Sequence, residues 1–207
     1  MKKDHIDTLI ERYPQLDGIR DNISLACDAV VNMAKNGGKL LLLGNGGSCA
    51  DCSHISGELL KGFLLKRPVP EGELDGLDPE LRGRLQQGVR AIPLPELTSL
   101  LSAFANDVDA DTAYAQLVYA LGGKYDVLLG ISTSGNAENI VRAFEVAGSM
   151  GLTRIALTGT GGGRLGALAE ITVNVPERET FKVQELHLPV YHAICAQVEQ
   201  ELFEKEN

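Results

Sequence analysis

The stretch Lys39-Leu-Leu-Leu-Leu-Gly44-Asn-Gly-Gly-Ser48 decides the fold of this chain. The run of leucines is typical of a short parallel strand that is buried on both faces. The glycine-rich segment that follows ends the strand, and residues 49–64 have a pattern that favours a helix. A buried strand, a glycine-rich turn and a helix, in that order, form the repeating unit of a doubly wound α/β sheet.

The same unit recurs along the rest of the chain. We expect further strands at 126–131, 154–158 and 171–175, and further helices at 2–13, 18–36, 137–150 and 183–205. Together they predict a flavodoxin-like three-layer sandwich, with a parallel sheet and helices at the N-terminus. Ligands of such sheets bind at the carboxyl ends of the strands, where the glycine-rich turns lie.

Residues 68–97 depart from the repeat, because they contain five prolines and many charges. Within them Asp78 and Pro79 are suited to the N-cap and first position of a short helix. We expect one domain over 1–207, in which 1–36 form a helical hairpin and 68–97 a surface insertion. Two roles stay open for the insertion: a flap over the site, or a solvated loop without function.

Composition excludes several classes of function. The net charge of −9 argues against binding to nucleic-acid backbones, and the absence of tryptophan removes the usual stacking platform. No apolar run reaches the roughly 18 residues that span a membrane, and the start of the chain lacks the hydrophobic region of a signal peptide. We therefore expect a cytoplasmic protein that binds neither nucleic acid nor membrane.

Ser132-Thr133-Ser134-Gly-Asn136 follows a predicted strand and opens a predicted helix. Hydroxyl groups and backbone N–H groups converge there, and the helix N-terminus adds partial positive charge. The segment predicts a phosphate site; the alternative is an ordinary helix cap. The turn with Asn45, Gly46 and Ser48 offers a second set of polar groups, suited to a sugar, and it lacks the Gly-Lys-Ser/Thr of a phosphate-binding P-loop.

Two helical segments carry polar side chains on one face. His54 and Glu58 are four residues apart, and Gln184 and His192 are eight apart, so each pair shares a face. If the two faces meet, they form a metal site of nitrogen and oxygen ligands with a carboxylate for proton transfer. Taken singly, each histidine is more often structural than a ligand. His187 is offset from His192 by five residues, and we expect it to be a packed or surface side chain.

The Cys49-Ala-Asp-Cys52 motif is a weak signal. A zinc ribbon needs a second such pair, which the sequence lacks, and a thioredoxin-like motif has aromatic and proline neighbours. We expect both cysteines to pack in the first turns of a helix in a reducing compartment.

An ordered set of segments makes the chain resemble a known family. They are Gly44-Asn-Gly-Gly-Ser48, His54-x-x-x-Glu58, Asn106-Asp107, Leu128-Leu-Gly-Ile-Ser-Thr-Ser-Gly-Asn136, Leu157-Thr-Gly and Gln184-Glu-x-His-x-x-x-x-His192. Together they look like the phosphoheptose (sedoheptulose 7-phosphate) isomerases of the sugar isomerase (SIS) domain superfamily. The resemblance covers nearly the whole chain outside 68–97.

The resemblance implies a ketose–aldose isomerase that forms homotetramers with active sites shared between subunits and binds one zinc ion (Zn2+) per subunit. It implies that Glu58 is the base and His192 the acid. The implied zinc ligands are His54, Glu58, Gln184 and His192. The candidate substrate and phosphate residues are Asn45, Gly46, Ser48, Asp107, Ser132, Thr133, Ser134, Asn136 and Gln184.

Three positions depart from the family pattern. Ala137 replaces a serine, Gly62 an arginine and Phe181 an aspartate. Lys61 or Lys66 is a candidate substitute for the missing arginine charge. Lost polar contacts change substrate preference more than chemistry, so the identity of the sugar phosphate stays open.

Other readings of the chain stay open. Some SIS-domain relatives bind the bacterial replication initiator protein without catalysis, but they lack the histidine that matches His192, so its presence favours an enzyme. Others are sugar-phosphate sensors, which usually carry an additional DNA-binding domain. A further alternative is an isomerase of a different sugar phosphate.

Overall fold

The computed structural model describes residues 4–204. The sheet consists of β1 (Leu40–Gly44), β2 (Ala91–Pro93), β3 (Val127–Ser132), β4 (Thr153–Thr158) and β5 (Ile171–Asn174). The α-helices are α1 (His5–Arg12), α2 (Arg20–Lys35), α3 (Gly47–Leu60), α4 (Pro79–Arg84), α5 (Thr98–Asp107), α6 (Ala113–Leu121), α7 (Glu138–Ser149), α8 (Gly163–Leu168) and α9 (Thr180–Phe203), and short 3-10 segments lie at 14–19, 94–96 and 110–112. None of the helices within 4–204 is both long and apolar enough to cross a membrane.

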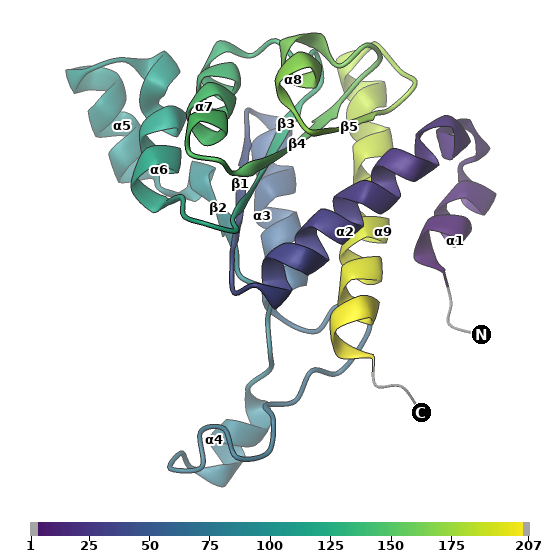
Figure 1. Cartoon of the computed structure of the whole chain (residues 1–207), viewed down its shortest axis with the longest axis vertical. Helices are drawn as coiled ribbons and strands as arrows, with labels where there is room; N and C mark the ends of the chain where they lie inside the picture. The colour runs from purple at the N-terminus through teal and green to yellow at the C-terminus, as the bar shows by residue number, and fades with distance from the viewer. Residues whose placement is uncertain (1–3, 205–207) are drawn as a thin grey trace.

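The sheet is parallel throughout and has the strand order β2-β1-β3-β4-β5. In β1 the leucines alternate between its two faces: Leu40 and Leu42 pack with α1, α2, α3 and α9, whereas Leu41 and Leu43 pack with α6, α7 and α8. The prediction of a doubly wound, three-layer sandwich is confirmed, and Figure 1 shows the helices on both sides of the sheet.

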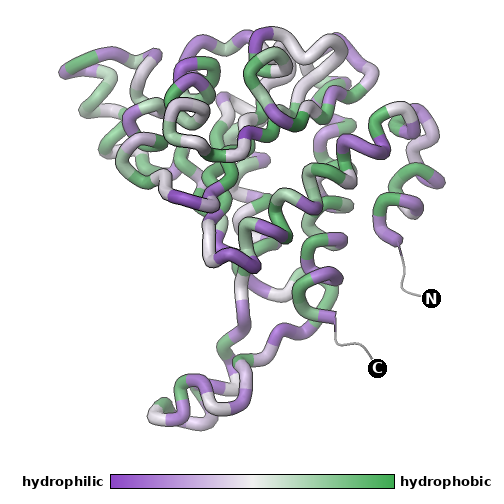
Figure 2. The backbone as a smooth tube through the Cα atoms, viewed as in Figure 1, coloured by the Kyte–Doolittle hydropathy of each residue, from purple (hydrophilic) through white to green (hydrophobic). Residues whose placement is uncertain are grey.

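The hydrophobic colour in Figure 2 runs along the central strands and the helix faces that meet them. All five residues of β1 and all six of β3 are buried. Burial on both faces explains why these strands are continuous apolar runs rather than alternating patterns. The runs therefore identified the central strands from sequence to within one or two residues.

The expected insertion 68–97 was too long at its C-terminal end. Ala91–Pro93 form β2, which pairs with Leu40–Leu42 at the edge of the sheet, and Leu94 is fully buried beyond it. Proline has no N–H for a sheet ladder, so it is confined to edge strands and strand ends, where Pro93 lies. Pro93, one of the five prolines that suggested a loop, therefore lies at the end of an edge strand. Residues 2, 3 and 205 of the expected terminal helices lie outside the described residues.

Residues 68–86 form an arm that projects away from the body and carries α4 near its tip (Figure 1). Pro68 and Gln86 close the base of the arm in an isolated antiparallel bridge. The Asp78 side chain accepts from Leu81 N at 2.9 Å, which confirms the predicted N-cap. The arm follows the C-terminal end of α3, whereas the N-terminal end of α3 follows the carboxyl end of β1. Within its own chain the arm therefore does not fold over the carboxyl edge of the sheet.

Candidate active site

The carboxyl ends of β1 and β3 lie side by side, with Gly44 paired to Ile131. The chain leaves β1 into α3, which packs on one face of the sheet, and leaves β3 into α7, which packs on the other. This divergence opens a crevice at the edge of a doubly wound sheet, where ligands bind. Asn45 and Asn139 exchange two side-chain hydrogen bonds across this point, at 2.9 and 3.0 Å.

The serine loop, residues 132–136, is held in one shape by its own contacts. Gly135 has φ +66°, and a Cβ there would lie 2.0 Å from the Gly162 carbonyl oxygen, so only glycine fits. The Asn136 backbone donates to Ser134 Oγ at 3.2 Å, and Asn136 Oδ1 accepts from Arg164 N at 3.1 Å. Ser132 is buried, whereas Ser134 is exposed. The first turn of α7 has no side-chain cap, so its N–H groups remain for an anion.

His54, Glu58 and His192 come together between α3 and α9, although α9 lies far along the chain. His54 Nε2 is 3.3 Å from His192 Nε2 and 3.5 Å from Glu58 Oε1. Helices α3 and α9 are in contact, and this contact brings the His54/Glu58 face of α3 against His192 of α9. The condition set from sequence, that the two polar faces meet, is thus fulfilled for these three residues, and their role as ligands stays a prediction.

Lys61 adds a positive charge to this cluster. Its Nζ lies 3.2 Å from Glu58 Oε2, one turn after the carboxylate. Gly62 has no room for the arginine of the family pattern, because a Cβ there would lie 2.3 Å from the Leu65 carbonyl oxygen. Of the two lysines considered from sequence, Lys61 is thus the one that contacts Glu58.

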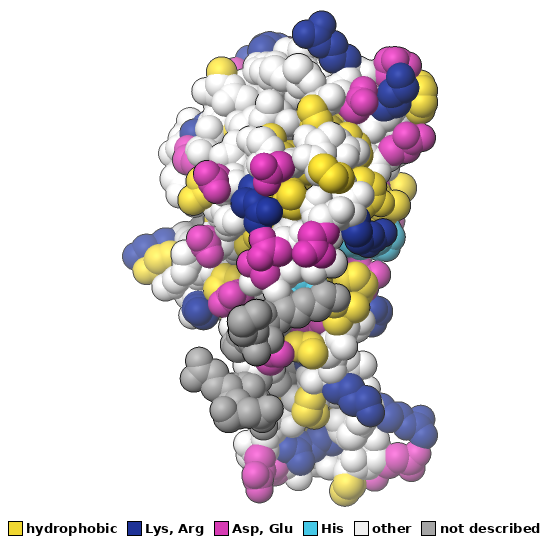
Figure 3. Space-filling view, turned by 90° about the vertical axis from the view of Figure 1, so that its right-hand side faces the viewer, with side chains coloured by type: hydrophobic (Ala, Val, Ile, Leu, Met, Phe, Trp, Pro, Cys, Tyr) yellow, Lys and Arg dark blue, Asp and Glu magenta, His cyan; other side chains and the backbone are white. Residues whose placement is uncertain are grey.

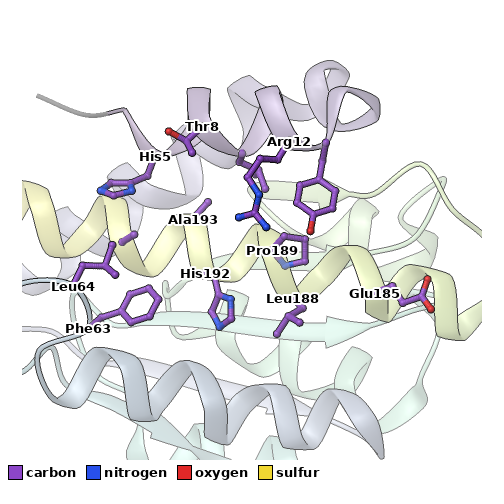
Figure 4. Close-up of a pocket in the computed structure, with 13 residues that line it drawn as sticks. His5, Thr8, Arg12, Phe63, Leu64, Glu185, Leu188, Pro189, His192 and Ala193 are labelled. Carbon is purple, nitrogen blue, oxygen red and sulfur yellow. The ribbon is translucent and has the colours of Figure 1, made fainter. Parts of the chain in front are cut away.

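His192 also faces a pocket of about 360 Å³ between α1, α9 and the turn after α3. Figure 4 shows His192 extending from α9 toward α3, with Phe63 beside it and Arg12 reaching down from α1. The Phe63 and His192 rings lie 5.7 Å apart between centroids. Burial, and then the neighbouring His54, lower the pKa of His192, while Glu58 opposes the shift. The imidazole is therefore predominantly neutral at pH 7 and carries one N–H.

Two other predicted site residues lie apart from this cluster. A Cβ at Gly47 would lie 2.6 Å from Gln184 Nε2, so the Gln184 amide packs against the start of α3 rather than beside His54 one to two turns later. Asp107 is exposed at the end of α5, where Asn106 donates to its carboxylate at 2.8 Å. Residues of α5 pack with α6–α8, on the opposite face of the sheet from α9.

The distances between the candidate ligand atoms can be compared with those of a zinc site. Two nitrogen ligands of a tetrahedral zinc ion, each at about 2.0–2.1 Å, lie about 3.3–3.4 Å from each other, close to the His54–His192 separation. Within 4–204, the contacts are pairwise, and no group of three or more His, Cys, Asp or Glu side chains is already arranged around one point. The residue types and the pair distances fit zinc.

Other side chains of the cluster escaped sequence reasoning. The Tyr191 hydroxyl contacts both His54 and Asp51, and the side chain of Asn139 pairs with that of Asn45. Asp51 does lie one turn before His54, a spacing that could have flagged it. Cys49 and Cys52 are free, and Cys52 is buried against the Ser48 carbonyl, as expected for packing residues. His187 is fully buried.

Comparison with known proteins gives a consistent result. The SIS domain family matches residues 5–159. A phosphoheptose isomerase of Burkholderia pseudomallei (strain 1710b) is 38% identical over 184 residues, covering 89% of this chain and 84% of its own. Phosphoheptose isomerase 2 of Campylobacter jejuni is 40% identical over 176 residues, covering 85% and 78%. The solved phosphoheptose isomerase of Neisseria gonorrhoeae superposes with a TM-score of 0.76 at 30% identity, covering 95% of each chain.

Proposed function

The chain belongs to the phosphoheptose isomerases of the SIS domain family, and we propose that it converts sedoheptulose 7-phosphate to D-glycero-D-manno-heptose 7-phosphate. The broader statement follows from the family: the protein is a phosphosugar isomerase of the aldose–ketose type. The observation that carries the finer proposal is the meeting of His54, Glu58 and His192 between α3 and α9.

Isomerisation moves a proton between C1 and C2 of the sugar through an enediol. One group must take the proton from carbon and return it, and another must protonate the oxygen. Glu58 is suited to the first role, since its carboxylate is largely buried yet polarised by Lys61 and His54. His192 is suited to the second, because a neutral imidazole presents an N–H to the developing oxyanion.

His54, Glu58 and His192 would hold the zinc ion. The family pattern implies Gln184 as the fourth ligand, and its amide would have to move from the start of α3 to join them. When bound, zinc polarises the carbonyl and hydroxyl oxygens and stabilises negative charge on the enediolate. Glu58 cannot act fully as ligand and base at once, so we propose that it alternates between these roles. The Lys61 ammonium, 3.2 Å from Glu58 Oε2, would serve as the positive partner of the carboxylate while it acts as the base.

The serine loop supports binding of the phosphate group. Ser132, Thr133 and Ser134 present hydroxyls beside the uncapped start of α7. Asn45, Gly46 and Ser48 of the neighbouring turn are the proposed sugar contacts. We also propose that the protein is a homotetramer with shared sites, because Asp107 and His192 of one chain lie on opposite faces of the sheet.

The test is turnover of sedoheptulose 7-phosphate by the purified protein, before and after chelation and after zinc is returned. We expect loss on chelation, recovery with zinc, and a fall of about 10²–10⁴-fold for Glu58→Gln and His192→Ala. Leu188→Ala, one turn before His192 on the same pocket wall, is the matched control and should retain activity. Full turnover by Glu58→Gln would remove the assigned base.

A different sugar phosphate is the second candidate, and Phe181 favours it. This side chain is 57% exposed at the start of α9 and offers no polar contact where the family has an aspartate. Zinc binding without sedoheptulose 7-phosphate turnover would support this candidate. Neither zinc nor turnover would favour a non-catalytic SIS-domain protein, such as a partner of the replication initiator.

A further inference from the structure

The phenol of Tyr191 lies between two side chains of α3. Its oxygen is 3.2 Å from Asp51 Oδ1 and 3.0 Å from His54 Nδ1. Tyr191 itself is 1% exposed, and Asp51 is half-buried. The three groups therefore form a short chain of hydrogen bonds, carboxylate to phenol to imidazole, on the side of His54 that faces away from Glu58 and His192.

The phenol has one proton and two neighbours. A tyrosine hydroxyl has an ordinary pKa of about 10 and is therefore protonated at neutral pH. If the phenol donated to His54, its oxygen would face the Asp51 carboxylate with no proton between them. Donation to Asp51 is therefore favoured, since hydrogen bonds to charged acceptors are the stronger ones. The phenol oxygen then accepts, and His54 Nδ1 must supply the proton.

We propose that Tyr191 and Asp51 are positioning residues that hold His54 as its Nδ1–H tautomer, so that the Nε2 lone pair points at Glu58 and His192. A histidine can bind a metal only through an unprotonated nitrogen, and in metal sites its other nitrogen usually donates to a carboxylate or carbonyl. Here the carboxylate acts through a phenol. The purpose of this tautomer, zinc binding by His54 Nε2, rests on the proposed function, whereas the tautomer itself does not.

Ring packing adds to the hydrogen bonds. The Tyr191 ring lies edge-on to His54, with 5.5 Å between centroids, and edge-on to His192, with 5.0 Å. One buried side chain thus contacts both imidazoles of the cluster. Tyr191 fixes the tautomer of His54 through its hydroxyl and the orientation of both rings through its edges and faces, and these two effects can be separated by removing the hydroxyl alone.

The tautomer is measured by ¹⁵N–¹H correlation spectra of the imidazoles in metal-free protein at pH 8, where histidine is ordinarily neutral. We expect His54 to be protonated at Nδ1 in the wild type. Tyr191→Phe should release it to a mixture of tautomers. Asp51→Ala should invert it, because the freed phenol proton then turns to Nδ1. An Nε2–H tautomer in the wild type, or no change in both variants, would overturn the proposal.

Zinc affinity gives a second readout by competition with a chromogenic chelator. Tyr191→Phe should weaken zinc binding by about 10–100-fold, as loss of outer-shell partners does in metal sites. Tyr114→Phe is the matched control, since Tyr114 is also buried and its hydroxyl donates to the Gly44 carbonyl at 2.9 Å, away from His54. Equal affinity in Tyr191→Phe and the control would refute the positioning role. Because the tautomer is read without metal or substrate, its failure is distinct from a failure of the isomerase assignment.

Discussion

His187 shows how the environment of one side chain sets a pH dependence. The residue has no exposed surface, and neither ring nitrogen has a hydrogen-bond partner among the described residues. Burial lowers its pKa to about 4, and the nearby Thr158 backbone offsets only part of this shift. The folded protein therefore excludes a proton that the unfolded chain binds below about pH 6.5.

The sign of the resulting effect follows directly. Between about pH 6.5 and 4 the unfolded state binds more protons at this position, so His187 makes the folded state less stable as the pH falls. We expect about 2 kcal/mol of the stability lost between pH 7 and 5 to come from this group. In urea unfolding at the two pH values, His187→Leu should lose about that much less than the wild type. An identical loss in both proteins would mean that His187 is accessible to protons in the folded state.

Helical spacing alone decided which site residues share a face. The offset of four between His54 and Glu58 guaranteed a shared face, and the meeting with His192 required only that α3 and α9 pack together. The positions of Tyr191 and Asp51 depended on how far each helix is rotated about its axis. That rotation is set by packing in the core, which spacing does not reveal.

At the scale of elements, Glu199 ties the turn after α3 to α9. Its carboxylate accepts from the backbone N–H groups of Phe63, Leu64 and Leu65 at 2.6–3.0 Å, and from Arg67 Nε at 2.7 Å. Both charged side chains are almost fully buried. Burial opposes ionisation of Glu199, but these donors outweigh it and lower the pKa. These contacts hold Phe63 beside His192 and fix the base of the arm.

Removal of this carboxylate should be costly. Glu199→Ala leaves Arg67 without its counter-charge and three N–H groups without an acceptor, and we expect a loss of about 3–5 kcal/mol in the free energy of unfolding. Glu201→Ala, an exposed carboxylate on the same helix, should change it by less than about 0.5 kcal/mol. Urea titrations compare the two. Similar small losses would show that water reaches Arg67 and replaces the carboxylate.

For the arm, in contrast to Glu199, we predict only a small change in the free energy of unfolding. The arginine near its tip, Arg82, donates to the carbonyls of Glu73 and Pro70 within the arm itself, and no residue of α4 is buried. Replacing residues 70–84 by Asn-Gly should therefore change the free energy of unfolding by less than about 1 kcal/mol, since loop length alone contributes little. The two roles considered for this segment then separate: unchanged turnover supports a solvated loop, and a fall in turnover at unchanged stability supports a flap over a neighbouring copy.

Most elements with a strong pattern were predicted, although α6 was missed despite its five buried residues. Strands β1, β3, β4 and β5 were expected close to their observed bounds. In β1, β3 and most of β4, burial on both faces produces apolar runs, whereas in β5 only Val173 is buried. β2 has three residues and a proline, so its pairing depends on β1 already being in place. Helix α5 has no buried residue, because its apolar side chains, Leu100 and Leu101 among them, are only partly covered by the core.

At the scale of the whole molecule, the proposed assembly can be compared with the distribution of side chains on the surface. On the face shown in Figure 3, acidic and basic side chains are interspersed, with hydrophobic side chains between them. Large apolar residues are also exposed around α5, where Val108 is 67% exposed and Leu97 38%. Helix α5 also carries Asp107, so covering this surface with a second copy would bring that carboxylate into a shared site.

Two inactive variants can reveal whether sites are shared. Asp107→Asn and His192→Ala should each abolish most turnover, and each alone stays inactive whether the two residues come from one chain or from two. Co-expressed in equal amounts, they should assemble mixed tetramers if the proposed homotetramer forms. If each site takes Asp107 from one subunit and His192 from another, about one quarter of the sites contain both wild-type residues, and about one quarter of the wild-type activity should return. If one chain supplies both residues, every site carries one defect and no activity returns.

Purification through two different tags, one on each variant, ensures that the measured species is mixed, and sedimentation velocity verifies its size. Absence of recovered activity in a verified mixed tetramer would place the whole site within a single chain, despite the sheet that separates α5 from α9.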